Sequence, residues 1–159
     1  MVQYLGEIKQ VKANAISREL QKAIINALPQ AIEQVKPFAH KFRGKNDIET
    51  ARNVWKFLRT QITYTKDKPH TQRIFLPSSF LHFKKGDCKS YATFAAAIFS
   101  ALKSPNGYHF TSYQSRTTPS HIYNFIRLAN GKHLPVDGCF KLFGVEKKPT
   151  YIRINKNNY

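Results

Sequence analysis

The spacing of apolar residues divides the first third of the chain into amphipathic helices. Apolar side chains recur at steps of three and four through residues 17–42, and Pro29 and Pro37 interrupt this pattern. Because a proline inside a helix removes a backbone hydrogen bond, we predict two short helices here. Asn46 or Asp47 can cap a third helix. That helix carries an apolar stripe that we expect to face the core, made of Ile48, Ala51, Trp55, Leu58 and Ile62.

The middle of the chain lacks a clear period and then becomes strongly apolar. Residues 63–85 contain Pro69, Pro77 and two adjacent serines, so we predict mostly loop. Connections of this length inside a domain tend to be functional, and this one is expected to form a wall of a cleft. Residues 87–102 are rich in alanine and aromatic side chains, which predicts a closely packed helix.

Asn106-Gly107 ends this helical element, and strand-like composition follows it. We predict strands over residues 108–114, 121–128 and 132–140, with Asn130-Gly131 as a hairpin turn between the last two. Helices first and strands later are typical of an α+β fold rather than a series of βαβ units. The expected architecture is therefore a set of N-terminal helices and one central helix packed on a small antiparallel sheet.

The length of 159 residues indicates a single domain with its own core. We expect the core to span about residues 46–142, with residues 1–45 as a helical N-terminal extension and residues 143–159 as a basic C-terminal segment. The first residues do not form a basic and then apolar signal region, and no apolar stretch reaches transmembrane length. A cytoplasmic location is therefore expected.

The charge of the chain is its most unusual bulk property. With 26 Lys and Arg against 9 Asp and Glu, the formal net charge is +17. Such a surface attracts nucleic acid, an anionic membrane or an acidic partner protein, and it can also be simply a solvated surface. No helix-turn-helix, zinc-finger or ribonucleoprotein motif is visible, so any nucleic-acid binding would be directed at phosphates.

Cys88 has the position expected of a reactive thiol. Asp87 can cap the apolar helix, which places Cys88 in its first turn. Free backbone N–H groups and the positive end of the helix dipole activate a thiolate there, and the same N–H groups can stabilise an oxyanion. The alternative is a small apolar side chain that fills the core, because free cysteines are often buried.

Two downstream residues favour the reactive interpretation. His121 starts an alternating strand, which is a rigid mount, and Asp137 lies in an apolar setting near the end of the next strand. A buried carboxylate needs a partner, and His121 is a suitable one. A histidine oriented by a carboxylate beside a thiol is the arrangement of nucleophilic catalysis.

The register of the hairpin decides whether these residues meet. With a strict two-residue turn at Asn130-Gly131, Asp137 would lie opposite Asn124, and His121 would point to the other face of the sheet. An odd number of loop residues or a bulge restores a common face. We therefore predict such an irregularity between Ile126 and Pro135.

The ordered set of these motifs resembles the transglutaminase-like superfamily within the papain-like group, and is most similar to its short bacterial and prophage-encoded members. The likeness covers about residues 48–140. The matching positions are Tyr64, Asp67, Gln72, Pro77, Gly86, Asp87, Cys88, His121, Tyr123, Val136 and Asp137. The sequence departs from the pattern at Lys89-Ser90, which replaces an acidic pair, and at Gly138, which replaces a proline.

The resemblance implies a papain-like fold and a triad of Cys88 as nucleophile, His121 as base and Asp137 as the orienting group. It makes Gln72 the candidate for a second oxyanion donor. The implied reaction is acyl transfer on an amide of a protein or peptide, ending in hydrolysis or in cross-linking to an amine, with no cofactor. Cys139 has the strand parity of Asp137, so it can approach the site as inert packing, as a redox partner or as a second thiol without a role.

Two other function classes remain open. A non-catalytic basic protein, such as a virion component or a nucleic-acid-associated protein, could use this fold as a scaffold, and the net charge favours it. A metalloenzyme is the remaining class, but the spacing of the other histidines does not fit a metal site. These histidines are His70, His82, His109 and His133.

Overall fold

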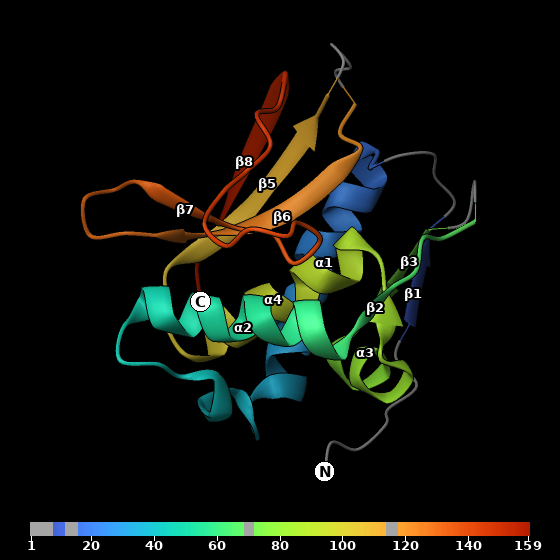
Figure 1. The fold of residues 1–159 in the computed structure, drawn as a ribbon. Coiled ribbons are helices and arrows are strands. Elements are labelled where there is room, and N and C mark those ends of the chain that lie inside the picture. Colours follow the sequence, from blue (N-terminus) through green and yellow to red (C-terminus); the bar gives the residue numbers. More distant parts are fainter. Residues whose placement is uncertain (1–7, 12–15, 69–71, 114–117) are drawn as a thin grey trace.

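A central helix, α4 (Cys88–Ala101), organises the fold. It is seen in a computed structural model, which describes residues 8–11, 16–68, 72–113 and 118–159. Every α4 residue from Cys88 to Ser100 is buried, and the five alanines in the helix allow its neighbours to approach closely. The other helices and the main sheet surround it (Figure 1), so the predicted α+β arrangement is confirmed.

The first helix is a single element, α1 (Arg18–Val35), capped by Ser17. The predicted interruption at Pro29 is wrong, whereas the one at Pro37 is present, because the 3-10 helix η1 (Ala39–Phe42) follows it. Pro29 lies on the solvent side of α1, while the opposite face is buried and packs against α4. Packing of that face outweighs the lost hydrogen bond. No helix within the described residues is long and apolar enough to cross a bilayer.

The predicted third helix is α2 (Asp47–Gln61), which follows the short 3-10 helix η1 (Ala39–Phe42). Asn46 is its cap and accepts a hydrogen bond from the Glu49 N–H at 2.9 Å. The apolar stripe is only partly correct. Ala51, Leu58 and Ile62 are buried and Trp55 is half-buried, but Ile48 is 40% exposed.

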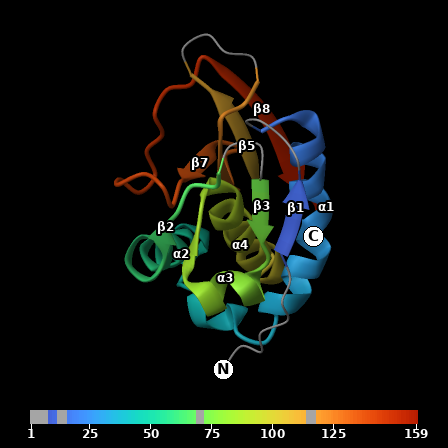
Figure 2. The same cartoon turned by 90° about the vertical axis from the view of Figure 1, so that its right-hand side faces the viewer.

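Residues 63–85 are more regular than predicted, so the interpretation as mostly loop is wrong. Two very short strands pair in parallel and bring the two ends of the segment together, and a longer strand pairs with an N-terminal strand (Figure 2). Pro77 starts a helix, as proline often does at the first helical position. The elements are β1 (Ile8–Val11), β2 (Thr63–Tyr64), β3 (Gln72–Phe75), α3 (Pro77–Phe83) and β4 (Lys85–Gly86).

The main sheet is antiparallel with the order β7-β6-β5-β8. Asn106-Gly107 opens the first of its strands instead of forming a turn. The basic C-terminal segment contributes a full edge strand, which the sequence analysis did not predict. The strands are β5 (Asn106–Ser112), β6 (His121–Arg127), β7 (His133–Val136) and β8 (Tyr151–Asn157).

The predicted irregularity in the β6–β7 hairpin is confirmed. Asn124 pairs with Val136, one position away from the register of a two-residue turn. Leu128 N–H donates to the Lys132 carbonyl at 2.8 Å, which leaves three residues in the loop, and Gly131 has the left-handed φ of +83° that such a loop requires. His121 and Asp137 therefore have the same parity across the hairpin.

Candidate active site

Cys88 lies at the first position of α4, as the sequence predicted. The strand β4 leads into it, and Asp87 caps the helix by accepting a hydrogen bond from the Lys89 N–H at 3.1 Å. The Cys88 residue is 6% exposed. Backbone N–H groups in the first turn of a helix lack partners within the helix, and the N–H of Cys88 itself lies in that turn beside the sulfur.

His121 and Asp137 meet across the β6–β7 hairpin. The Nε2 atom of His121 and the Oδ2 atom of Asp137 are 2.7 Å apart, and the other carboxylate oxygen accepts a hydrogen bond from the Cys139 N–H at 2.9 Å. Both oxygens of Asp137 are thus engaged. The side chain of Cys88 contacts the same imidazole ring.

The electrostatic surroundings of His121 favour the imidazolium form. Burial by itself lowers the pKa of His121, but hydrogen bonds with Asp137 and Cys88, together with the negative charges of these groups, raise it well above 6.5. The contacts around the ring therefore favour a proton on His121 more strongly than on an ordinary histidine. The structure thus brings Cys88, His121 and Asp137 into one connected group.

Gly138 explains one of the departures from the family pattern. A Cβ atom at this position would lie 2.7 Å from a Leu58 side-chain atom and 3.0 Å from the Tyr91 ring. The chain after Asp137 therefore passes close to α2 and α4, and a larger residue at position 138 would require Leu58 to shift. Trp55 fixes the segment further along, because its indole N–H donates to the Phe140 carbonyl at 3.1 Å.

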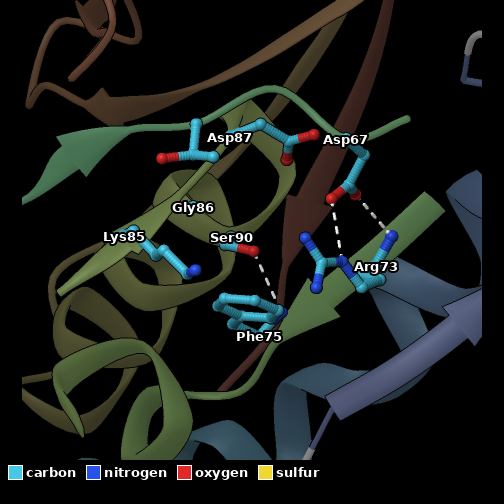
Figure 3. Close-up of a pocket in the computed structure, with 8 residues that line it drawn as sticks. Asp67, Arg73, Phe75, Lys85, Gly86, Asp87 and Ser90 are labelled. Carbon is cyan, nitrogen blue, oxygen red and sulfur yellow. Dashed lines mark hydrogen bonds and ion pairs between the residues drawn. The ribbon is translucent and has the colours of Figure 1, made fainter. Parts of the chain in front are cut away.

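The other departure from the family pattern is Lys89, which stands where an acidic residue is usual. It is buried among acidic and basic side chains. Its ammonium group contacts the carboxylate of Asp87 and lies 3.6 Å from that of Asp67. Arg73 pairs with Asp67 at 3.0 Å (Figure 3). Burial raises the pKa of Asp87, and the charge of Lys89 opposes this rise. A cation near a helix N-terminus is unfavourable by itself, and the two aspartates offset that cost.

The same region joins β3 to the nucleophile helix. The Phe75 N–H of β3 donates to the Ser90 hydroxyl in the first turn of α4 at 2.9 Å (Figure 3). The Arg73 N–H donates to Asp67 at 2.6 Å. The segment that precedes β3 is therefore tied to the first turn of α4 by side chains as well as by the β2–β4 ladder.

Gln72, the predicted oxyanion donor, does not join the group. It is the first residue of β3, where it pairs with Val11, and among the described residues no hydrogen bond links its side chain to Cys88. Cys139 does approach the site, and both cysteines are free thiols. Burial and the charges of Cys88 and Asp137 raise the pKa of the Cys139 thiol.

Sequence reasoning missed the part played by Tyr64. It matched the family pattern, but its segment was interpreted as loop and no periodicity marked it. The structure places the Tyr64 side chain beside the backbone N–H of Cys88. Burial and the charge of Cys88 raise the pKa of Tyr64 well above 10.

Of the other histidines, His109 and His133 form a pair with nitrogens 3.0 Å apart, and His82 lies in α3. His70 lies outside the described residues. Within the residues that the structure describes, no group of three or more His, Cys, Asp or Glu side chains has the geometry of a metal site.

Comparison with known sequences adds independent information on this constellation. The profile of a transglutaminase-like domain matches residues 33–132, which is more than half of the chain and includes Cys88 and His121. The chain belongs to the transglutaminase-like family. A comparison of this transglutaminase-like protein with curated proteins found no match.

Two solved structures share the fold of the transglutaminase-like protein at low sequence identity. A proposed cysteine protease from Cytophaga hutchinsonii has a TM-score of 0.54 and 15% identity over 80% of this chain and 49% of its own. A proposed protease from Parabacteroides distasonis has a TM-score of 0.55 and 13% identity over 73% of this chain and 26% of its own. The chain thus spans less than half of each of these proteins, and the likeness is one of fold.

Proposed function

We propose that the protein is a cysteine-dependent acyl-transfer enzyme that acts on amide bonds of proteins or peptides. The observation that carries this proposal is the connected group of Asp137, His121 and Cys88, with the pKa of His121 raised by its two partners. A histidine that only fills the core has no need of both a thiol and a carboxylate against its ring. This arrangement is suited to storing a proton beside a nucleophile.

The reaction would proceed in two halves. The Cys88 thiolate attacks the carbonyl carbon, so that a sulfur–carbon bond forms and the carbonyl electrons move to oxygen. His121 then gives its proton to the leaving nitrogen as the carbon–nitrogen bond breaks, which leaves a thioester. In the second half, His121 accepts a proton from water or from an amine that attacks the thioester, and the thiolate returns. Asp137 holds the ring and balances its charge.

Alkylation kinetics test the state of Cys88 directly. The experiment uses Cys139→Ala protein, so that iodoacetamide reports one thiol, and compares it with the same protein carrying His121→Gln. An activated Cys88 reacts at pH 6 about 10²-fold faster than in the His121 variant, because the histidine sustains the thiolate. Equal rates in the two proteins would contradict the proposal.

A second assay separates hydrolysis from transfer. The protein is incubated with p-nitrophenyl acetate, with and without hydroxylamine as an acceptor amine, and Cys88→Ala is the blank. Cys88-dependent release of p-nitrophenol supports acyl transfer, and the yield of hydroxamate measures the share that goes to an amine. We expect water to be the main acceptor, which corresponds to a peptidase or amidase.

A second candidate function is a non-catalytic basic protein on the same fold, such as a virion component or a nucleic-acid-associated protein. The net charge of +17 favours it. In this case the protein binds random-sequence duplex DNA with an affinity that falls steeply between 50 and about 200 mM salt, as expected for binding to phosphates. An inert Cys88 in the alkylation assay would favour this candidate over the enzyme.

A further inference from the structure

Tyr64 is held next to the nucleophile by the backbone. It ends β2 and pairs with Gly86 of β4, two residues before Cys88. The Thr65 N–H donates to the Gly86 carbonyl at 2.8 Å, which extends this short parallel ladder. The position of Tyr64 is thus set by the same strand that leads into the nucleophile helix.

The side chain of Tyr64 lies over the start of α4. Its ring makes an edge contact with Tyr91, with centroids 5.9 Å apart and planes at 73°. Its hydroxyl lies beside the backbone N–H of Cys88 and near the thiols of Cys88 and Cys139. The residue is still 49% exposed, so the ring has room to move toward solvent or toward a bound substrate.

The Cys88 N–H is the donor that an oxyanion would use. When the Cys88 sulfur bonds to a carbonyl carbon, the oxygen of that carbon comes to lie beside this N–H. The Tyr64 hydroxyl therefore lies at or next to the oxyanion position in the free protein. A phenol accepts through its oxygen and also donates its O–H, so it can turn from an acceptor for the N–H into a donor to the oxyanion.

We propose that Tyr64 is a catalytic residue that donates the second hydrogen bond to the oxyanion, together with the Cys88 N–H. This rests on the proposed acyl transfer. During attack the sulfur–carbon bond forms, the carbonyl electrons move to oxygen, and Tyr64 keeps its proton while sharing it in a hydrogen bond. Burial and the neighbouring Cys88 raise the pKa of Tyr64, so the hydroxyl remains a protonated donor at neutral pH. Tyr64 takes the role that the sequence pattern assigned to Gln72.

The test compares two reactions of the same thiol in full-length Tyr64→Phe protein. Acylation by p-nitrophenyl acetate passes through an oxyanion, whereas alkylation by iodoacetamide displaces iodide at a saturated carbon and forms none. We expect the acylation rate to fall by about 10²-fold, the usual effect of removing one oxyanion donor, and the alkylation rate to stay within about twofold. The unchanged alkylation rate also shows that the site is still folded.

Tyr91→Phe is the matched control. It removes the hydroxyl of the neighbouring ring, which donates to the Ile62 carbonyl at 3.2 Å and not to Cys88. Both reactions should stay within about twofold in this variant. Acylation of Tyr64→Phe at the wild-type rate would overturn the role of Tyr64, and faster acylation would do so as well, because the hydroxyl would then only block the N–H. A wild-type protein without Cys88-dependent acylation would overturn the proposed function and this role with it.

Discussion

His109 and His121 lie on neighbouring strands of one sheet, and their surroundings give them opposite properties. Burial lowers the pKa of both side chains. His121 overcomes this effect because Asp137 accepts its Nε2 hydrogen bond at 2.7 Å and because Cys88 also contacts the ring. His109 does not overcome it, and its pKa falls to about 4.

The partners of His109 account for this difference. Its Nε2 contacts the neutral ring of His133 at 3.0 Å, while its Nδ1 is 3.7 Å from a Glu146 oxygen. That carboxylate also contacts the Tyr123 hydroxyl, so its acceptor capacity is shared. The comparison shows that burial alone keeps a histidine neutral, and that a carboxylate at hydrogen-bonding distance is what makes His121 a proton store.

The largest contrast is expected from replacing each histidine by glutamine. His121→Gln should lower the rate of acyl transfer from p-nitrophenyl acetate by about 10³-fold, because the partner of the thiolate and the base that activates water in the second half of the reaction are both lost. His109→Gln should change the rate by no more than about threefold, since its ring bonds neither Cys88 nor Asp137. Rates are measured at pH 7, with circular dichroism to verify folding. Comparable losses in the two variants would remove the distinction.

A smaller contrast is expected between the two carboxylates. Asp137→Asn keeps an acceptor for the Cys139 N–H but removes the charge that stabilises the His121 imidazolium. The pKa of His121 then falls, so the high-pH limb of the acylation profile should move to lower pH and the maximal rate should fall by about 10²-fold. Glu146→Gln is the control and should leave the profile in place. A profile that does not move in Asp137→Asn would contradict the assigned geometry.

The third contrast concerns how His109 and His121 make the free energy of unfolding depend on pH. Unfolded His109 binds a proton below pH 6.5, whereas folded His109 does so only near pH 4, so the free energy of unfolding falls across this window as the pH is lowered. The loss should reach up to about 3 kcal/mol at low ionic strength. His121 behaves in the opposite sense: its contribution is complete below pH 6.5 and is lost as pH rises through its raised pKa.

Urea unfolding from pH 7 to pH 4 measures this slope. His109→Phe should show less loss of stability over the window than the wild-type protein, because it removes one group that resists protonation. The carboxylates titrate in both proteins, so the difference between the two curves isolates His109. Parallel curves would show that His109 is not held neutral by the fold.

The smallest effect is expected from Gly131, in the loop of the β6–β7 hairpin that carries His121 and His133. Gly131 has a φ of +83°, and a Cβ atom there would meet nothing within 4 Å. Gly131→Ala should therefore cost only the conformational strain, about 1 kcal/mol, and should leave the acylation rate unchanged. Thermal unfolding measures the cost. A loss of activity would mean that the substitution changes the register between His121 and Asp137.

Sequence reasoning was most successful where a local signal fixed a position. Asp87 marked the start of α4 because capping depends on a single side chain. The parity argument reduced the hairpin to a choice between an even and an odd loop, and the odd loop with Gly131 is present. These two local facts are sufficient to bring Cys88 and His121 toward Asp137.

The features that could not be predicted depend on packing between distant segments. Pro29 continues α1 because the opposite face is buried against α4, which the sequence around Pro29 does not record. The strand β8 has a largely exposed and basic composition, and it forms because β5 offers it a full ladder. Tyr64 reaches the Cys88 N–H only through the β2–β4 pairing, a contact between segments more than twenty residues apart.

Because Lys89 is buried, its charge and the charges of the exposed lysines and arginines respond differently to salt. Mobile ions screen the exposed lysines and arginines of a strongly basic protein, but they do not enter a cluster whose Lys89 and Asp87 side chains are 3% and 5% exposed. Raising the ionic strength should therefore weaken electrostatic binding to the outer surface while the support beneath Cys88 stays intact. Any chemistry at Cys88 that depends on this support should then be measurable in buffers concentrated enough to release nucleic acid.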